Sequence, residues 1–111
     1  MANLQKHRAH ESLNTESAAV WDQQTKVTVG SSPTNIDVTN YHTIHFLTTE
    51  DMFFEFSTGT TMDTTNGLYL QGGQTIYSLR IPHGLGSKGQ TIYFNAQRFV
   101  TTDTEIRYVL S

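Results

Sequence analysis

The sequence predicts an all-β fold: a small antiparallel β-sandwich or barrel-like jelly roll, preceded by an extended N-terminal arm. Two observations lead to this prediction. From position 24 onward, short runs alternate apolar and polar side chains with a period of two, which is the pattern of half-buried strands. Segments rich in Gly, Asn, Asp and Ser separate the runs and supply turns. Short strands at this spacing are typical of sandwiches and small barrels.

Seven or eight segments carry the strand pattern: 25–29, 34–39, 41–47, 51–57, 68–70, 74–81, 90–95 and 104–110. Alternation gives each longer run one apolar face, because successive side chains of a strand point to opposite sides. The predicted apolar faces carry Val27, Val29, Ile36, Val38, Ile44, Phe46, Met52, Phe54, Phe56, Ile106, Tyr108 and Leu110. The same alternation places Phe53 and Glu55 on an outward face.

Composition divides the chain into an arm at 1–22 and a β-sandwich domain at 23–111. The first 20 residues contain few large apolar side chains and much Asn, Gln, Ser, His and Glu, so they show no apolar helical stripe. An isolated helix of this length is marginal in water. We therefore expect an arm that becomes ordered on a partner.

The arm holds the candidate partner-binding residues. Lys6, His7, Arg8 and His10 form a small basic patch that would dock on an acidic surface, and the alternative is a solvated tail. Trp21 stands at the junction of arm and domain, where we expect it to pack the arm against the sandwich.

The overall composition excludes several classes of protein. Charged residues make up 15% of the 111 residues and the net charge is −3, which argues against a nucleic-acid partner. The chain has no cysteine, so it has no disulfide and no zinc–thiolate site. No segment approaches the roughly twenty apolar residues of a membrane span, and the first residues lack the apolar core of a secretory signal. We expect a protein made in a cytoplasm, with no membrane partner.

The pentapeptide Gly-Gln-Thr-Ile-Tyr occurs at 73–77 and again at 89–93. Solenoids need at least three stacked units, so two copies are better explained as two strands that open alike. We expect these two strands to pair as a hairpin, which places the copies at opposite ends of the ladder. Between them, Gly84, Gly86 and Gly89 match the dinucleotide pattern G-x-G-x-x-G. That pattern needs a following helix to hold the pyrophosphate, whereas a strand follows here, so we predict an exposed loop and no nucleotide cofactor.

The sequence also predicts no catalytic and no metal site. His42 and His45 are three residues apart and point to opposite faces of a strand, with His42 expected to be half-buried beside Ile44 and His45 to be on the surface. A cysteine nucleophile and a G-x-S-x-G elbow are both missing. The candidate carboxylates sit at turns or on polar strand faces: Asp51, Glu55, Asp63, Asp103 and Glu105.

Exposed aromatic side chains keep a second interpretation open. Trp21, Tyr69, Tyr77 and Tyr93 would together offer a platform on which sugar rings stack. The alternative is ordinary cross-strand packing, since aromatic pairs stabilise sheets.

From Tyr41 to Ser111 the order of parts resembles the small β-rich structural proteins of tailed bacteriophage particles. The resemblance rests on "FFEFSTGT", "LYLQGGQTIYSLRIPHG", "IYFNAQ" and the closing "TDTEIRYVL". It implies a capsid decoration (cement) protein, located in the virion, that clamps the major capsid protein lattice as a homo-oligomer, often a trimer.

The sequence therefore predicts a non-enzymatic virion protein without cofactor or metal. The alternatives are a tail, connector or fibre-attachment protein of the same particle, a carbohydrate-binding module and a small hydrolase.

Overall fold

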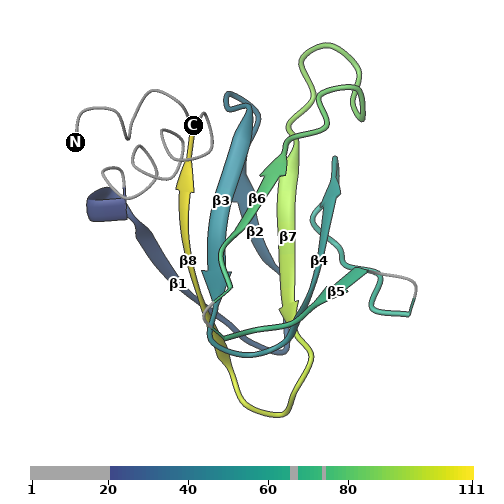
Figure 1. Ribbon diagram of the computed structural model, residues 1–111. Helices are drawn as coiled ribbons and strands as arrows, with labels where there is room; N and C mark the ends of the chain where they lie inside the picture. The colour runs from purple at the N-terminus through teal and green to yellow at the C-terminus, as the bar shows by residue number, and fades with distance from the viewer. Residues whose placement is uncertain (1–20, 66–67, 74) are drawn as a thin grey trace, which may run out of the picture.

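The computed structural model describes residues 21–65, 68–73 and 75–111, which form two packed antiparallel sheets (Figure 1). A single turn of 3-10 helix, η1 (Trp21–Gln23), precedes the strands. The strands are β1 (Thr25–Val29), β2 (Thr34–Asp37), β3 (Thr43–Thr48), β4 (Met52–Ser57), β5 (Leu68–Leu70), β6 (Tyr77–Arg80), β7 (Tyr93–Arg98) and β8 (Thr104–Leu110). The predicted all-β fold is confirmed.

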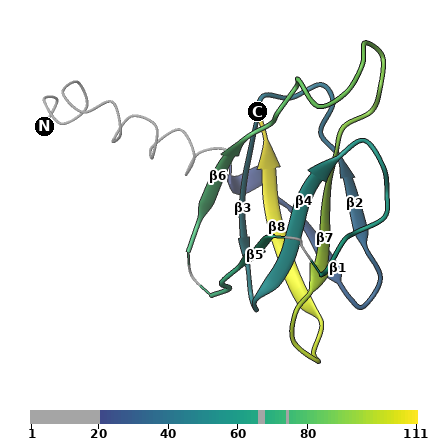
Figure 2. The same ribbon diagram turned by 90° about the vertical axis from the view of Figure 1, so that its right-hand side faces the viewer.

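The strand pairing is that of one long hairpin rolled on itself. β1 pairs with β8, β2 with β7, β3 with β6 and β4 with β5, all antiparallel. The pairs β3–β8 and β4–β7 then join these ribbons into two sheets, ordered β1-β8-β3-β6 and β2-β7-β4-β5 (Figure 2). This order of eight strands in two sheets defines a jelly roll.

The topology corrects one expectation about the repeated pentapeptide. β6 and β7 do not form a hairpin, because β6 belongs to the first sheet and β7 to the second. The two copies also meet different surroundings: Ile76 is 54% exposed, whereas Ile92 is 3% exposed. Both copies run into a strand that begins at the tyrosine, but they are not a duplicated structural unit.

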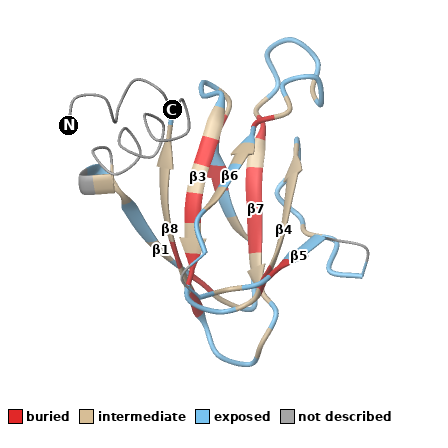
Figure 3. Cartoon of the chain, viewed as in Figure 1, coloured by how far each residue is buried: buried red, intermediate tan, exposed pale blue. Residues whose placement is uncertain are grey.

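The core lies between the sheets and centres on two phenylalanines. Phe46 of β3 and Phe94 of β7 are both fully buried, and their ring centroids are 5.0 Å apart across the sandwich. Phe94 also packs against the rings of Phe54 and Phe56 on its own sheet. Burial is accordingly concentrated along β3 and β7 (Figure 3).

The predicted apolar faces are confirmed along the chain. The buried core includes Val29, Ile36, Val38, Ile44, Phe46, Met52 and Ile106, and the partly buried side chains packed against it include Val27, Phe54, Phe56, Tyr108 and Leu110. Residue periodicity thus identified the inner surface of both sheets correctly.

The link between β5 and β6 makes a close backbone contact with the turn between β3 and β4. The link from β5 to β6 runs over the turn between β3 and β4, where Gly73 N–H donates to the Thr48 carbonyl and Gly72 N–H donates to the Asp51 carboxylate. A Cβ on Gly72 would lie 2.2 Å from the carbonyl carbon of Glu50. Only glycine fits at this crossing, which ties β5 to the body of the domain.

A second turn aligns the start of β7. The Asp37 carboxylate accepts hydrogen bonds from the Thr39 hydroxyl (2.6 Å) and the Thr39 N–H (3.0 Å), and the Thr39 hydroxyl in turn accepts from the Ile92 N–H (2.9 Å). The Thr39 hydroxyl and then the Thr39 N–H lower the pKa of Asp37 below its usual 3.8. The ionised carboxylate therefore supports the turn.

We expect Phe94→Ala to lower the free energy of unfolding by about 3–5 kcal/mol, because it leaves a cavity against three other rings. Phe99→Ala, the same change at a residue that is 51% exposed, is the matched control and should cost much less. Urea denaturation measures both. Equal losses would contradict the assignment of Phe94 to the core.

We expect the Asp37 turn to add an acid-dependent component to stability. A lowered folded-state pKa means that this contribution is fully present above the unfolded-state value and is lost as pH falls through the folded-state value. Asp37→Asn should therefore remove part of the stability that wild type shows at neutral pH and flatten its decline below pH 3.8. Urea denaturation across pH 2–6 tests this, and parallel curves for the two proteins would refute it.

Candidate binding surface on the second sheet

The outer face of the second sheet carries an exposed group of three rings, here called the aromatic cluster: Phe53, Tyr69 and Phe99. The Phe53 and Phe99 ring centroids are 5.2 Å apart, and those of Tyr69 and Phe99 are 4.8 Å apart. Tyr69 is 53% exposed and Phe99 is 51% exposed. Rings in contact with one another and half open to solvent form one continuous apolar surface.

Strand register brings the three rings together. Phe53 of β4 lies directly opposite Tyr69 of β5 on one side and opposite Gln97 of β7 on the other. Phe99 follows the end of β7, where its N–H donates to the Asp51 carbonyl (3.3 Å) and holds it beside β4. Because Met52 and Phe54 point into the core, Phe53 must point outward, as the sequence predicted.

The other half of this face is covered by the segment that follows β4. Asn95 of β7 is fully buried, and its side-chain amide donates to the Gly59 carbonyl (2.9 Å) and, at 3.5 Å, to the Thr61 carbonyl. The Asn35 amide of β2 donates to Asn95 Oδ1 (2.7 Å) and to the Thr60 carbonyl (3.0 Å). Two asparagines thus hold the segment down over β2 and β7.

Glu55 holds the same segment further along. Its carboxylate accepts a hydrogen bond from the Asp63 N–H (3.1 Å), and Asp63 Oδ1 accepts from the Thr65 N–H (3.0 Å). The face is therefore divided into a polar half under the segment 58–65 and an open half that holds the aromatic cluster.

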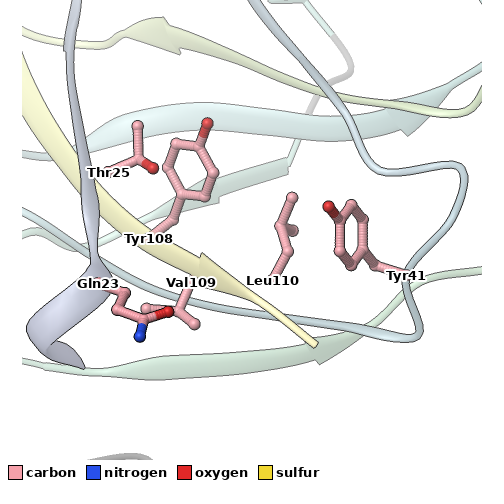
Figure 4. Close-up of a pocket in the computed structure, with 6 residues that line it drawn as sticks. All are labelled: Gln23, Thr25, Tyr41, Tyr108, Val109 and Leu110. Carbon is pink, nitrogen blue, oxygen red and sulfur yellow. The ribbon is translucent and has the colours of Figure 1, made fainter. Parts of the chain in front are cut away.

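A pocket of about 310 Å³ lies elsewhere, beside η1 and β8 (Figure 4). Figure 4 shows Tyr108 and Leu110 on one side of β8 and Val109 on the other, as strand alternation requires. Its remaining lining residues are Gln23, Thr25 and Tyr41. The pocket adjoins the point where the arm joins the domain.

The predicted arm residues have different outcomes. Lys6, His7, Arg8 and His10 lie outside the described residues, so their role remains a prediction. Trp21 lies in η1, where its carbonyl accepts from the Gln24 N–H (3.2 Å). It is half-buried, and its indole Nε1 is buried without a hydrogen-bond partner among the described residues.

The predicted burial of His42 and His45 was wrong. His42 lies just before β3 and is exposed, with its ring in edge contact with His83 at 5.7 Å, whereas His45 is half-buried and hydrogen-bonded to the Ser78 hydroxyl (2.8 Å). The strand begins two residues later than expected, so alternation does not govern His42. Within the described part of the chain, no three His, Asp or Glu side chains are grouped as a metal site requires.

The suggested sugar platform is not assembled. Tyr77 faces the core, with its ring 5.4 Å from Phe46 and its hydroxyl donating to the Gln71 carbonyl. Tyr93 is half-buried at the opposite end of β7 from Phe99, and Trp21 precedes β1 of the other sheet. Of the four side chains, only Tyr69 belongs to the aromatic cluster, and sequence analysis missed Phe99 altogether.

Comparisons of the chain with protein-family models, with curated proteins and with solved structures gave no match. Among the described helical residues, none forms a helix long and apolar enough to cross a membrane. The proposal of function therefore rests on the fold, the surface and the sequence pattern.

We expect Asn95→Ala to destabilise the domain by about 1–3 kcal/mol, because it removes the hydrogen bonds that the buried Asn95 side chain makes with the Gly59 carbonyl and the Asn35 amide. Amide hydrogen exchange in this segment should accelerate more than in β3. Gln97→Ala, at the next outward position of β7, is the control. Unchanged exchange in Asn95→Ala would contradict the role given to this side chain.

Proposed function

We propose that this protein is a non-enzymatic virion structural protein, a capsid decoration protein that attaches to the major capsid lattice through the aromatic cluster. The single observation that carries the proposal is the patch of contacting, half-exposed rings on an otherwise polar sheet face. Contiguous exposed apolar surface marks an interaction site on a soluble domain.

The fold is compatible with several functions and does not by itself identify one. Eight-stranded jelly rolls occur in viral capsid proteins, lectins and cupins, and one fold serves many functions. Here the space between the sheets is filled by fully buried side chains such as Ile44, Phe46, Met52 and Phe94. A packed interior favours binding on the outer surface over a ligand held between the sheets.

The chemistry of the aromatic cluster favours a protein over a sugar. Protein interfaces are enriched in aromatic side chains, and tyrosine is frequent among the residues that dominate binding energy. Two of the three rings are phenylalanines, which have no polar group for the hydroxyls of a sugar. Phe53 and Phe99 thus fit aliphatic side chains of a partner better than a glycan.

The carboxylates named as candidates for catalysis form structural contacts. Asp51 accepts from the Gly72 N–H, and Glu55 accepts from the Asp63 N–H. Asp103 pairs with Arg98 at 2.6 Å and Glu105 pairs with Arg107 at 2.9 Å. This use of four carboxylates in turns and ion pairs supports a structural role.

The resemblance to phage structural proteins implies that the partner is the major capsid protein. Among virion roles, a tail, connector or fibre-attachment position is the alternative within the same class. A surface that binds chiefly by apolar contact is suited to permanent attachment on a particle.

Binding to capsids tests the proposal. The probe is a capsid assembled from the major capsid protein of the same genome, without this protein, and the readout is co-sedimentation. We expect Phe99→Ala to weaken binding at least about tenfold, which corresponds to about 1.4 kcal/mol, because one exposed ring of the cluster is lost. Thr28→Ala, at an exposed position of β1, is the control and should bind as wild type.

Two further conditions sharpen this test. Binding should survive a chelator and change little between low and high salt, because apolar contacts are insensitive to screening. Loss with chelator, equal binding of Phe99→Ala and wild type, or binding to a glycan array instead of capsids would each refute the proposal.

A further inference from the structure

The four edge strands differ in how they are protected. β1 and β6 are the edges of the first sheet, and β2 and β5 are the edges of the second. Unpaired edges template pairing with another chain, and proteins commonly block them with charged side chains or proline. β1 carries Lys26, β2 carries Asp37 and β6 carries Arg80.

β5 has no such protection. Its sequence is Leu-Tyr-Leu, with neither charge nor proline, and its first two side chains, Leu68 and Tyr69, are 63% and 53% exposed. It lies at the end of its sheet beside β4 (Figure 1). An apolar, uncharged edge strand is the surface of this domain best suited to pair with another strand.

We propose that β5 pairs antiparallel with β5 of a second copy of this chain, about a two-fold axis through Tyr69. The strand reads the same in both directions. The axis therefore sets Leu68 opposite Leu70 of the second copy, Leu70 opposite Leu68, and Tyr69 opposite itself. Self-complementarity is what a two-fold interface demands.

The backbone can form the hydrogen bonds of this pairing whichever residues of β5 direct their N–H and C=O groups to the open edge. In an antiparallel pair, alternate residues direct their N–H and C=O groups to opposite sides. The edge of β5 that faces away from β4 thus presents the backbone N–H and C=O groups of either Tyr69 or the two leucines. Under the two-fold axis, Tyr69 meets Tyr69 in the first case and Leu68 meets Leu70 in the second, so donors meet acceptors each time.

The pairing also joins the aromatic clusters. An axis perpendicular to the sheet keeps both Tyr69 side chains on the same outer face, with Cβ atoms about 4.5–5.5 Å apart. The two clusters become one aromatic strip on a continuous sheet made from both copies. Aromatic cross-strand pairs stabilise such sheets.

Pairing with another edge of the same chain fits less well. Against β6, the outward-facing Tyr69 would share its face with Ser78 and Arg80, and against β2 it would share its face with Asn35 and Asp37, because side chains that lie on one face of a continuous sheet stay on that face. A charged side chain would then lose solvent without a partner. The two-fold pairing leads to a dimer, not to the trimer that the family resemblance implies.

Single cysteines test the register, because the chain has none of its own. In the paired sheet, the two Tyr69 Cα atoms lie about 4.5–5.5 Å apart, within the range of a disulfide. The two Leu68 Cα atoms lie about 8 Å apart, outside that range. We expect Tyr69→Cys to form a covalent dimer under mild oxidation at least tenfold faster than Leu68→Cys.

Sedimentation of the full-length protein provides the second measurement. Wild type should have twice the chain mass of 12.5 kDa. Tyr69→Lys should be monomeric, because it sets like charges opposite each other across the axis. Thr28→Lys on β1 is the control and should stay dimeric, with circular dichroism confirming that both variants fold.

A monomeric wild type, a dimer that Tyr69→Lys leaves intact, or equal crosslinking of the two cysteine variants would overturn the pairing. These outcomes are separate from capsid binding. A dimer that does not bind capsids would refute the decoration role alone, and a monomer that binds them would refute the pairing alone.

Discussion

The contact between Phe46 and Phe94 across the two sheets is the constraint on which the remaining structure depends. Both rings are fully buried, and they come from the inner faces of β3 and β7. Each of these strands lies inside its sheet, so the contact clamps the two sheets together at their middle. Because burial of large aromatic surface dominates the stability of a small domain, the strand register on both sides is fixed by keeping these rings inside.

The same register decides what the outer surface offers. With Met52 and Phe54 held inward, Phe53 has to face solvent, and its cross-strand neighbour Tyr69 faces solvent with it. Buried Asn95 holds the segment after β4 over one half of the sheet and leaves the other half open. The exposed rings are thus the consequence of a packed interior on one side and a hydrogen-bonded cover on the other.

The distribution of charge follows a related logic. Three edge strands carry a charged side chain, whereas the apolar edge of β5 adjoins the aromatic cluster. Apolar surface and an open backbone edge therefore occur at one place in the fold. A domain with few charges and a group of contacting, exposed rings at one edge is suited to association with other proteins.

The sequence by itself determined the fold class, the position of nearly every strand and the inner faces of the sheets, because the period-two alternation of apolar side chains is a local property. It also determined that Phe53 faces outward. Only the tertiary structure decided the order of the eight strands in the two sheets, the placement of β6 and β7 in different sheets, and the contact of Phe99 with both Phe53 and Tyr69. Tyr77 illustrates the difference: its place in a strand was readable locally, but its contact with Phe46 was not. Pairing partners far apart in the chain leave no local pattern, since they are selected by the total burial of the folded domain.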